Sequence, residues 1–252
     1  MLASITNEPV ERGSERTVQG ETIFVATPAW RRRYPAASAA VLAVRLAAPP
    51  INTRALDAVR EQLERESRVR YGGLARSDLR ATGNLPAYVS YYRQFGQTYH
   101  VLHQIESVAV KGKPLVPREP LVEAGFLAEL ATGLLTASHD LDALTLPITI
   151  DVATGTERYT RYNGDAVTAK AGDMLMRDQR EILTTIILGP AAYARITPQT
   201  RSALYCVYAP PGVSPTAVHD HLALIERTIR LIEPAAVMQA SIVLTAPPES
   251  SS

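Results

Sequence analysis

The chain has 252 residues, of which 46% are hydrophobic and 20% charged, and its formal net charge is +1. Such a chain can bury a sizeable core, and its charge excludes the global basic field on which non-specific RNA or DNA binding depends. The single cysteine, Cys206, excludes a disulfide framework and favours a reducing, cytoplasmic location. No window approaches the roughly 20 apolar residues of a membrane span, and the first residues are too polar for a secretion signal, so neither a membrane nor a DNA partner is expected.

The first half of the chain predicts mainly helices. Residues 1–20 form a polar segment that is expected to be a flexible arm. Asn52 is expected to cap a helix whose apolar stripe is Leu56, Val59 and Leu63 and which ends before Gly72. A buried strand is predicted over 39–47, and two further helices over 86–96 and 122–135.

From Leu146 onward the pattern changes to strands. An Asn163-Gly164 pair predicts a hairpin, because it supplies the positive φ values that tight hairpin turns need. The predicted strands are 146–153, 157–162, 173–178, 181–188, 202–209 and 241–246, with an amphipathic helix over 219–233 and a frayed tail over 247–252. Helices followed by mostly antiparallel strands favour an α+β fold, with 21–246 as one domain.

The common cofactor and metal motifs are missing from the sequence. There is no phosphate-cradling glycine loop, no nucleophile elbow and no zinc-type spacing, so no cofactor or metal is expected. His219 and His221 lie two residues apart and are assigned to the first turn of a helix. His100 and His103 are assigned a structural or surface role, and Cys206 is expected to be a small core hydrophobe.

One histidine remains, in the stretch TASHDLDAL (136–144). Read alone, His139 could be a general base, a metal ligand or a helix-end cap, with a structural histidine as the simplest interpretation, and no partner ligand has suitable spacing for a metal. Asp142 is expected to brace the turn into the next strand, and Asp140 to face solvent.

The order of segments around this stretch resembles a known family. Residues 121–210 resemble the aminoacyl-tRNA editing module in the β chain of bacterial phenylalanyl-tRNA synthetase, as a free-standing protein without the ligase machinery. The resemblance rests on the ordered set LVEAG, TASHDLDAL, TLPITIDVA, GTERYTRYNG, AGDMLMRD, ILTTIILG, ITPQT and SALYCVYAP.

This resemblance implies a fold, an activity and a pocket. The fold is a three-layer arrangement in which a β-sandwich of mostly antiparallel strands is flanked by helices. The activity is hydrolysis of a wrongly attached amino acid from tRNA. Carried over by position, the pocket histidine is His139 and a loop glycine is Gly189, whose loop amides are candidate oxyanion donors.

The family's pattern is not fully kept. A pocket threonine falls on Gly125, beside Phe126, and a second loop glycine falls near Ile186. The glutamate that reads the tyrosine hydroxyl falls on Cys206, which implies a less polar ligand than tyrosine.

Three functions follow as hypotheses. The first is a trans-acting deacylase of mischarged tRNA, with His139 orienting or activating water and Gly125, Phe126, Gly189 and Cys206 lining the pocket. The second is a non-catalytic module that binds a free amino acid or similar small ligand, and the third an interaction protein with a vestigial pocket.

The arginines between residues 60 and 80 bear on the first hypothesis. Arg68, Arg70 and Arg76 are candidate contacts to the tRNA acceptor end, although runs of charge usually form a solvated face. A homodimer in which the apolar C-terminal helix and strand of two copies pair is a further hypothesis.

Overall fold

The computed structural model describes residues 15–18, 21–50 and 52–248. Of the predicted N-terminal arm, residues 1–14 and 19–20 lie outside the described residues, while Glu15–Val18 form strand β1. Of the predicted tail, 249–252 also lie outside them.

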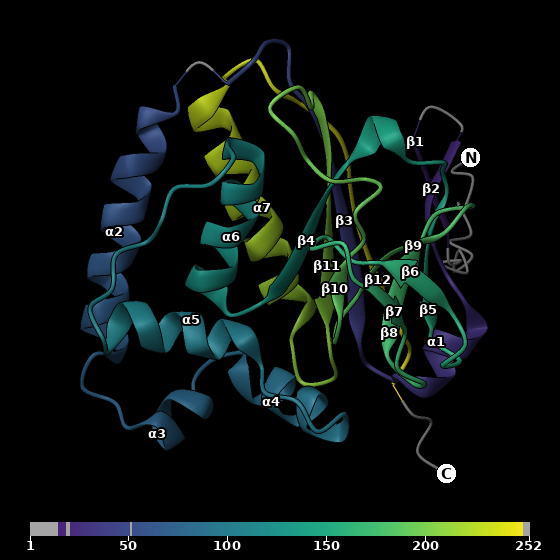
Figure 1. The fold of residues 1–252 in the computed structure, drawn as a ribbon, viewed down its shortest axis with the longest axis horizontal. Helices are drawn as coiled ribbons and strands as arrows, with labels where there is room; N and C mark the ends of the chain where they lie inside the picture. Colours follow the sequence, from purple (N-terminus) through teal and green to yellow (C-terminus); the bar gives the residue numbers. More distant parts are fainter. Residues whose placement is uncertain (1–14, 19–20, 51, 249–252) are drawn as a thin grey trace, which may run out of the picture.

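Two sheets form the centre of the fold (Figure 1). The four-stranded sheet is antiparallel, in the order β12 (Val237–Thr245), β3 (Ser38–Arg45), β11 (Ser202–Ala209) and β4 (Leu135–Asp140). The six-stranded sheet has the order β1, β2 (Glu21–Ala26), β5 (Ile148–Val152), β8 (Met174–Arg177), β9 (Ile182–Thr185) and β10 (Gly189–Pro190). In it β2 and β5 run parallel and the other pairs antiparallel.

Most of the helices lie on the far side of the four-stranded sheet from the six-stranded one (Figure 1). They are α2 (Arg54–Tyr71), α3 (Arg76–Arg80), α5 (His100–Ala109), α6 (Pro120–Thr132) and α7 (Pro215–Ile232). Helix α4 (Leu85–Gln94) lies at one end of both sheets, where Tyr88 bonds to β11 and Tyr91 to β8, and α1 (Pro28–Arg33) packs on β5.

Strand β11 shows how the layers are joined. Because successive side chains of a strand point to opposite faces, Tyr205 and Tyr208 reach different layers. The Tyr205 hydroxyl donates to the Leu121 carbonyl in α6 (2.7 Å), and the Tyr208 hydroxyl donates to the Thr184 carbonyl in β9 (2.9 Å). The predicted α+β fold with three layers is confirmed.

Local predictions agree in most elements and fail at some boundaries. The hairpin forms between β6 (Arg158–Thr160) and β7 (Ala166–Thr168), with Gly164 at φ +91°. The first long helix ends before Gly72 as expected, but its N-cap is Thr53 rather than Asn52, and no side chain makes a capping bond there.

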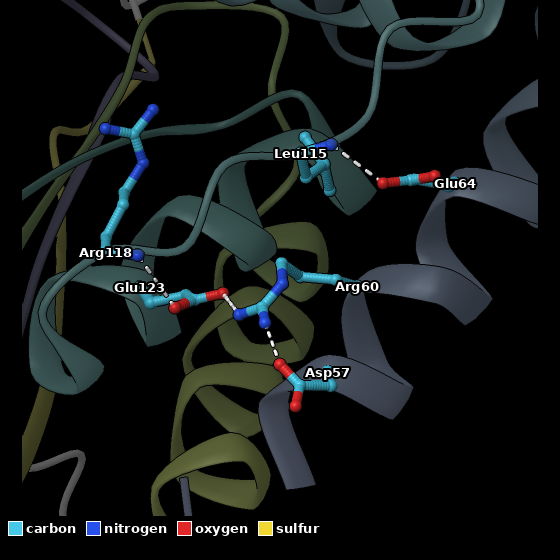
Figure 2. A network of polar contacts seen from close by, with 6 residues as sticks. All are labelled: Asp57, Arg60, Glu64, Leu115, Arg118 and Glu123. Carbon is cyan, nitrogen blue, oxygen red and sulfur yellow. Dashed lines mark hydrogen bonds and ion pairs between the residues drawn. The ribbon is translucent and has the colours of Figure 1, made fainter. Parts of the chain in front are cut away.

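Helix α2 is joined to α6 by an ionic network whose central pair, Arg60 and Glu123, is buried (Figure 2). The Arg60 guanidinium donates to the carboxylates of both Asp57 and Glu123. Glu123 also accepts the backbone amide of Arg118 (3.1 Å), and Glu64 that of Leu115 (2.7 Å). The network therefore fixes α2, the segment before α6 and α6 itself, whose last turn carries part of the site described next.

Candidate functional site

A cavity of about 510 Å³ lies between β4, the edge strand of the four-stranded sheet, and the turn from β9 to β10. Part of its wall is apolar and is formed by Leu135, Ala137, Ile186, Ile187 and Leu188. Its polar side chains include Gln97, Thr98, His100, Glu129, Thr136 and Arg161. A cavity of this size accommodates a small molecule.

Tyrosine hydroxyls hold the β9–β10 segment in place. The donors and accepting carbonyls are Tyr208 and Thr184 (2.9 Å), Tyr92 and Ile186 (2.8 Å), and Tyr159 and Gly189 (2.8 Å). Because each hydroxyl is used in this way, the rings of Tyr92 and Tyr208 present mainly apolar surface to the cavity.

The amides of the same turn are also engaged. Ile186 donates to the Met174 carbonyl (3.1 Å), Ile187 to the Asp173 carboxyl (3.0 Å) and Leu188 to the Thr185 hydroxyl (3.0 Å). These three amides are therefore not free to donate to an oxyanion, and the prediction for the amide of Gly189 itself stays a prediction. Asp173 is a positioning residue, and burial raises its pKa to about 6.

Glu129 is the buried acid of the cavity. It lies in the last turns of α6, is 7% exposed, and accepts the Thr136 amide through Oε1 (2.7 Å). Burial raises its pKa from 4.5 to about 8, an effect that the Thr136 amide and the charge of Arg118 only partly offset. At neutral pH the carboxyl group is mostly protonated and can donate a hydrogen bond.

Thr136 is fixed by a second buried group, His221 of α7. The Thr132 hydroxyl donates to the Ala128 carbonyl (2.8 Å), so it accepts the hydrogen on His221 Nδ1 (2.8 Å). His221 Nε2 then accepts the Thr136 hydroxyl hydrogen (2.6 Å). Burial lowers the pKa of His221 to about 3, so the ring stays neutral and the Thr136 proton is directed into the helical layer.

Two further side chains give the cavity its charge and a titratable group. Arg161 is half-buried, and its guanidinium makes no ion pair with any residue of the described ranges. The His100 ring packs against Tyr92 and Tyr99. Its pKa is lowered because partial burial, and secondarily His103, disfavours the charged form.

His139 lies elsewhere. It is in β4, paired with Leu204 of β11, with none of its surface exposed. Neither ring nitrogen has a hydrogen-bond partner among the described residues, and burial lowers its pKa to about 4. Ala137 lines the cavity instead, because His139 is two residues further along the same face of the strand.

The other predicted pocket residues are divided between two faces of the sheet. Gly189 lines the 510 Å³ cavity, whereas Gly125 and Phe126 of α6 line a second cavity of about 140 Å³. Cys206 is wholly buried in β11, opposite Ala137, and burial raises its pKa far above the ordinary value. The structure therefore does not bring His139, Gly189 and Cys206 to one cavity, since only Gly189 lines it.

The two cavities nevertheless meet at Glu129 and Thr136, which line both. A Cβ at Gly125 would meet Thr136 and the Tyr205 ring at 3.4 Å, an ordinary contact distance.

The aspartates beside His139 have exchanged roles relative to the prediction. Asp140 caps the following 3-10 helix (Leu141–Ala143), accepting the Asp142 amide (3.1 Å) and the Thr200 hydroxyl (2.6 Å). Asp142 is exposed and lies 3.8 Å from Arg45. Asp140 caps because it is the last residue before the chain turns out of the strand.

The arginines predicted to contact tRNA already have partners. Arg68 donates to Glu64 (2.8 Å), Arg76 lies 3.6 Å from Glu106, and Arg70 stacks over Tyr71. None of the three lines the 510 Å³ cavity.

Sequence reasoning missed Glu129, Thr136, Arg161, His100 and His221. Two of them carried a signal. Glu129 is the one charged residue in the apolar run GFLAELATGLL, and His221 lies four residues before Ile225, on the apolar face of α7. Thr136 and Arg161 have no such signal, because their place depends on long-range packing.

Two features are absent from the part of the chain that the structure describes. No group of three or more His, Cys, Asp or Glu residues there is arranged to hold a metal ion. Within the same ranges, no helix combines the length and apolarity that crossing a membrane requires.

No family model and no curated protein matches the sequence. Among solved structures, the chain is similar to an N-terminal fragment of the phenylalanyl-tRNA synthetase beta-subunit from Pyrococcus horikoshii, with a TM-score of 0.46 and 11% identity. The similarity covers 92% of this chain and 52% of that one, so the chain spans about half the length of the fragment. This is a weak resemblance, at the level of the fold.

Proposed function

We propose that the protein binds an amino acid, or an amino-acid-like group, in the 510 Å³ cavity. The observation that carries the proposal is the joint presence of Glu129 and Arg161 in a lining that also has an apolar wall. A carboxyl group for an ammonium, a guanidinium for a carboxylate and an apolar wall for a side chain match the three parts of an amino acid.

The pKa of Glu129 makes the proposal testable through pH. An ammonium ion beside the carboxyl favours its ionised form, so binding of an amine releases the proton that Glu129 holds below about pH 8. Affinity for an amino acid is expected to rise about tenfold per pH unit from pH 6 to 8. A ligand with an acetylated amine is expected to lack this dependence.

The experiment is calorimetric titration with a panel of amino acids and their N-acetyl and amide derivatives. Glu129→Gln keeps an acceptor for the Thr136 amide and is expected to lose both affinity for amines and the pH dependence. His139→Leu is the matched control, because His139 is buried outside the cavity. A panel without any binding ligand, or unchanged binding in Glu129→Gln, would contradict the proposal.

Hydrolysis of an aminoacyl ester on tRNA is the second candidate. The observation that favours it is His100, an imidazole on the wall of the same cavity whose pKa is lowered by burial. In this reaction water attacks the ester carbonyl, the imidazole takes the water proton and returns it to the leaving ribose hydroxyl, and a free amino acid is released.

A deacylation assay tests this candidate. The protein is incubated with several mischarged tRNAs and release of the amino acid is followed. Hydrolysis above the spontaneous rate that is lost in His100→Ala but kept in His139→Leu supports it. Release at the spontaneous rate across the panel rejects it and leaves the binding function in place.

A further inference from the structure

Another hollow, separate from the 140 Å³ cavity beside Gly125, lies next to the 510 Å³ cavity. It has a volume of about 190 Å³ and lies between α3, α4 and the start of α5. Arg80 and Arg93 line it, at the ends of α3 and α4, together with Gln97, Thr98 and Tyr99. No carboxylate is among its lining residues.

The two arginines differ from others on the same side of the molecule. Arg65 and Arg68 of α2 each pair with a glutamate four residues earlier, and Arg76 pairs with Glu106. Neither Arg80 nor Arg93 makes an ion pair or a side-chain hydrogen bond with any residue of the described ranges. Two cations without counter-charges therefore border one hollow.

The hollow shares two lining residues with the 510 Å³ cavity. Gln97 and Thr98 line both, so Arg80 and Arg93 lie one short segment away from the cavity. Two guanidinium groups, each with several N–H donors in a planar fork, match the oxygens of a phosphate group. The Thr98 hydroxyl and the Gln97 amide add neutral donors.

We propose that the Arg80–Arg93 hollow is a phosphate-binding site, and that it binds the phosphate of a ligand whose other part enters the adjoining cavity. Only the statement that the rest of the ligand enters the adjoining cavity rests on the proposed function. A phosphomonoester and the phosphodiester of a nucleic-acid strand present the same group, so the probes must separate the two sources.

The test is an NMR titration of the full chain, in which the backbone amides of Gln97 and Thr98 report on the hollow. The probes are orthophosphate, adenosine 5′-monophosphate and an RNA tetranucleotide. Saturable shifts of both amides are expected with orthophosphate, and tighter binding with whichever larger probe represents the ligand. Each of Arg80→Gln and Arg93→Gln is expected to raise the dissociation constant about tenfold, as for loss of a charge-assisted hydrogen bond.

Arg65→Gln is the control, because it removes an exposed arginine of α2 outside the hollow and should leave phosphate affinity unchanged. Unshifted amides, or an equal loss of affinity in the control variant, would overturn the assignment. Amino-acid titration of the same samples keeps the two proposals apart. Amino-acid binding without phosphate binding rejects the hollow alone, whereas the reverse result rejects the cavity assignment alone. If neither larger probe binds more tightly than orthophosphate, the proposal that the ligand extends from the hollow into the cavity is rejected.

Discussion

Two buried histidines, His139 and His221, differ in the hydrogen bonding of their ring nitrogens. His221 has both ring nitrogens bonded to threonine hydroxyls at 2.6 and 2.8 Å, whereas His139 has no partner for either among the described residues. Both are wholly buried. A buried polar group without a partner costs free energy that a bonded one does not, so the two residues should respond oppositely to the same substitution.

His139→Leu is expected to increase the free energy of unfolding at pH 7 by about 1–3 kcal/mol, because it removes two unpaired polar atoms from the core. His221→Leu is the matched comparison and is expected to lower it by a similar amount, since it leaves the Thr136 hydroxyl without its acceptor. Urea denaturation of both variants measures the difference. Destabilisation by His139→Leu would show that the ring has a partner, such as an ordered water.

At the scale of single residues, sequence reasoning identified a pocket only in part. Gly189 lines the main cavity as expected, but a motif cannot tell which of Ala137 and His139 reaches it, because both lie on one face of a strand. Glu129 was identifiable as a lone charge in an apolar helix. Arg161 reaches the cavity through a bridge between Arg161 and Ala191 that no local pattern encodes.

At the scale of elements, tyrosines from other segments bond to the carbonyls of the β9–β10 segment, so we expect them to restrict its motion. Tyr92→Phe removes the 2.8 Å bond to Ile186 and is expected to cost about 1 kcal/mol. The loss should be local, so amide hydrogen exchange at Ile187 and Leu188 should accelerate while exchange in the sheet core changes less. Tyr162→Phe, whose ring is 43% exposed, is the control. Equal acceleration in both variants would mean that the hydroxyl bond does not hold the turn.

The attachment of α2 to α6 depends on the network in Figure 2. Arg60→Met leaves the buried Glu123 without its cation and is expected to lower the free energy of unfolding by about 3–5 kcal/mol. Arg65→Met on the same helix breaks an exposed pair with Glu61 and is expected to cost less than about 1 kcal/mol. Thermal or urea unfolding compares them, and similar losses would show that the Arg60 network contributes no more than a surface pair.

At the scale of the whole molecule, apolar runs and helical periodicity predicted the fold class. The run 39–47 is apolar throughout because β3 is buried on both faces, and the helix over 219–233 has one apolar stripe and lies within α7. The pairing of the strands could not be predicted from the sequence, since no local signal places β4 at the edge beside β11 or makes β2 run parallel to β5. The cavity lies at that edge, so the site was less predictable than the elements that form it.

The pH dependence of stability combines the buried groups of the whole molecule. His139 and His221 have pKa values lowered to about 4 and 3, so the unfolded chain binds their protons first and stability is lost as the pH falls from about 6.5 through these values. Asp173 and Glu129 have pKa values raised to about 6 and 8, so their contribution is present at low pH and lost as the pH rises through these values.

Stability is therefore expected to be greatest at mildly acidic pH, and of these four groups only Glu129 still changes its protonation on unfolding between pH 6.5 and 8. Over this interval the free energy of unfolding should fall by roughly 1.4 kcal/mol per pH unit. Glu129→Gln cannot ionise and should abolish this decline. Since Glu129 opposes the histidines between about pH 4.5 and 8, the variant should also lose stability more steeply than the parent as the pH falls from 6 to 4.5. Urea denaturation at half-unit pH intervals measures the free energy of unfolding on both sides of its maximum. An unchanged decline in Glu129→Gln would place the titrating group elsewhere and remove the basis for proton release on ligand binding.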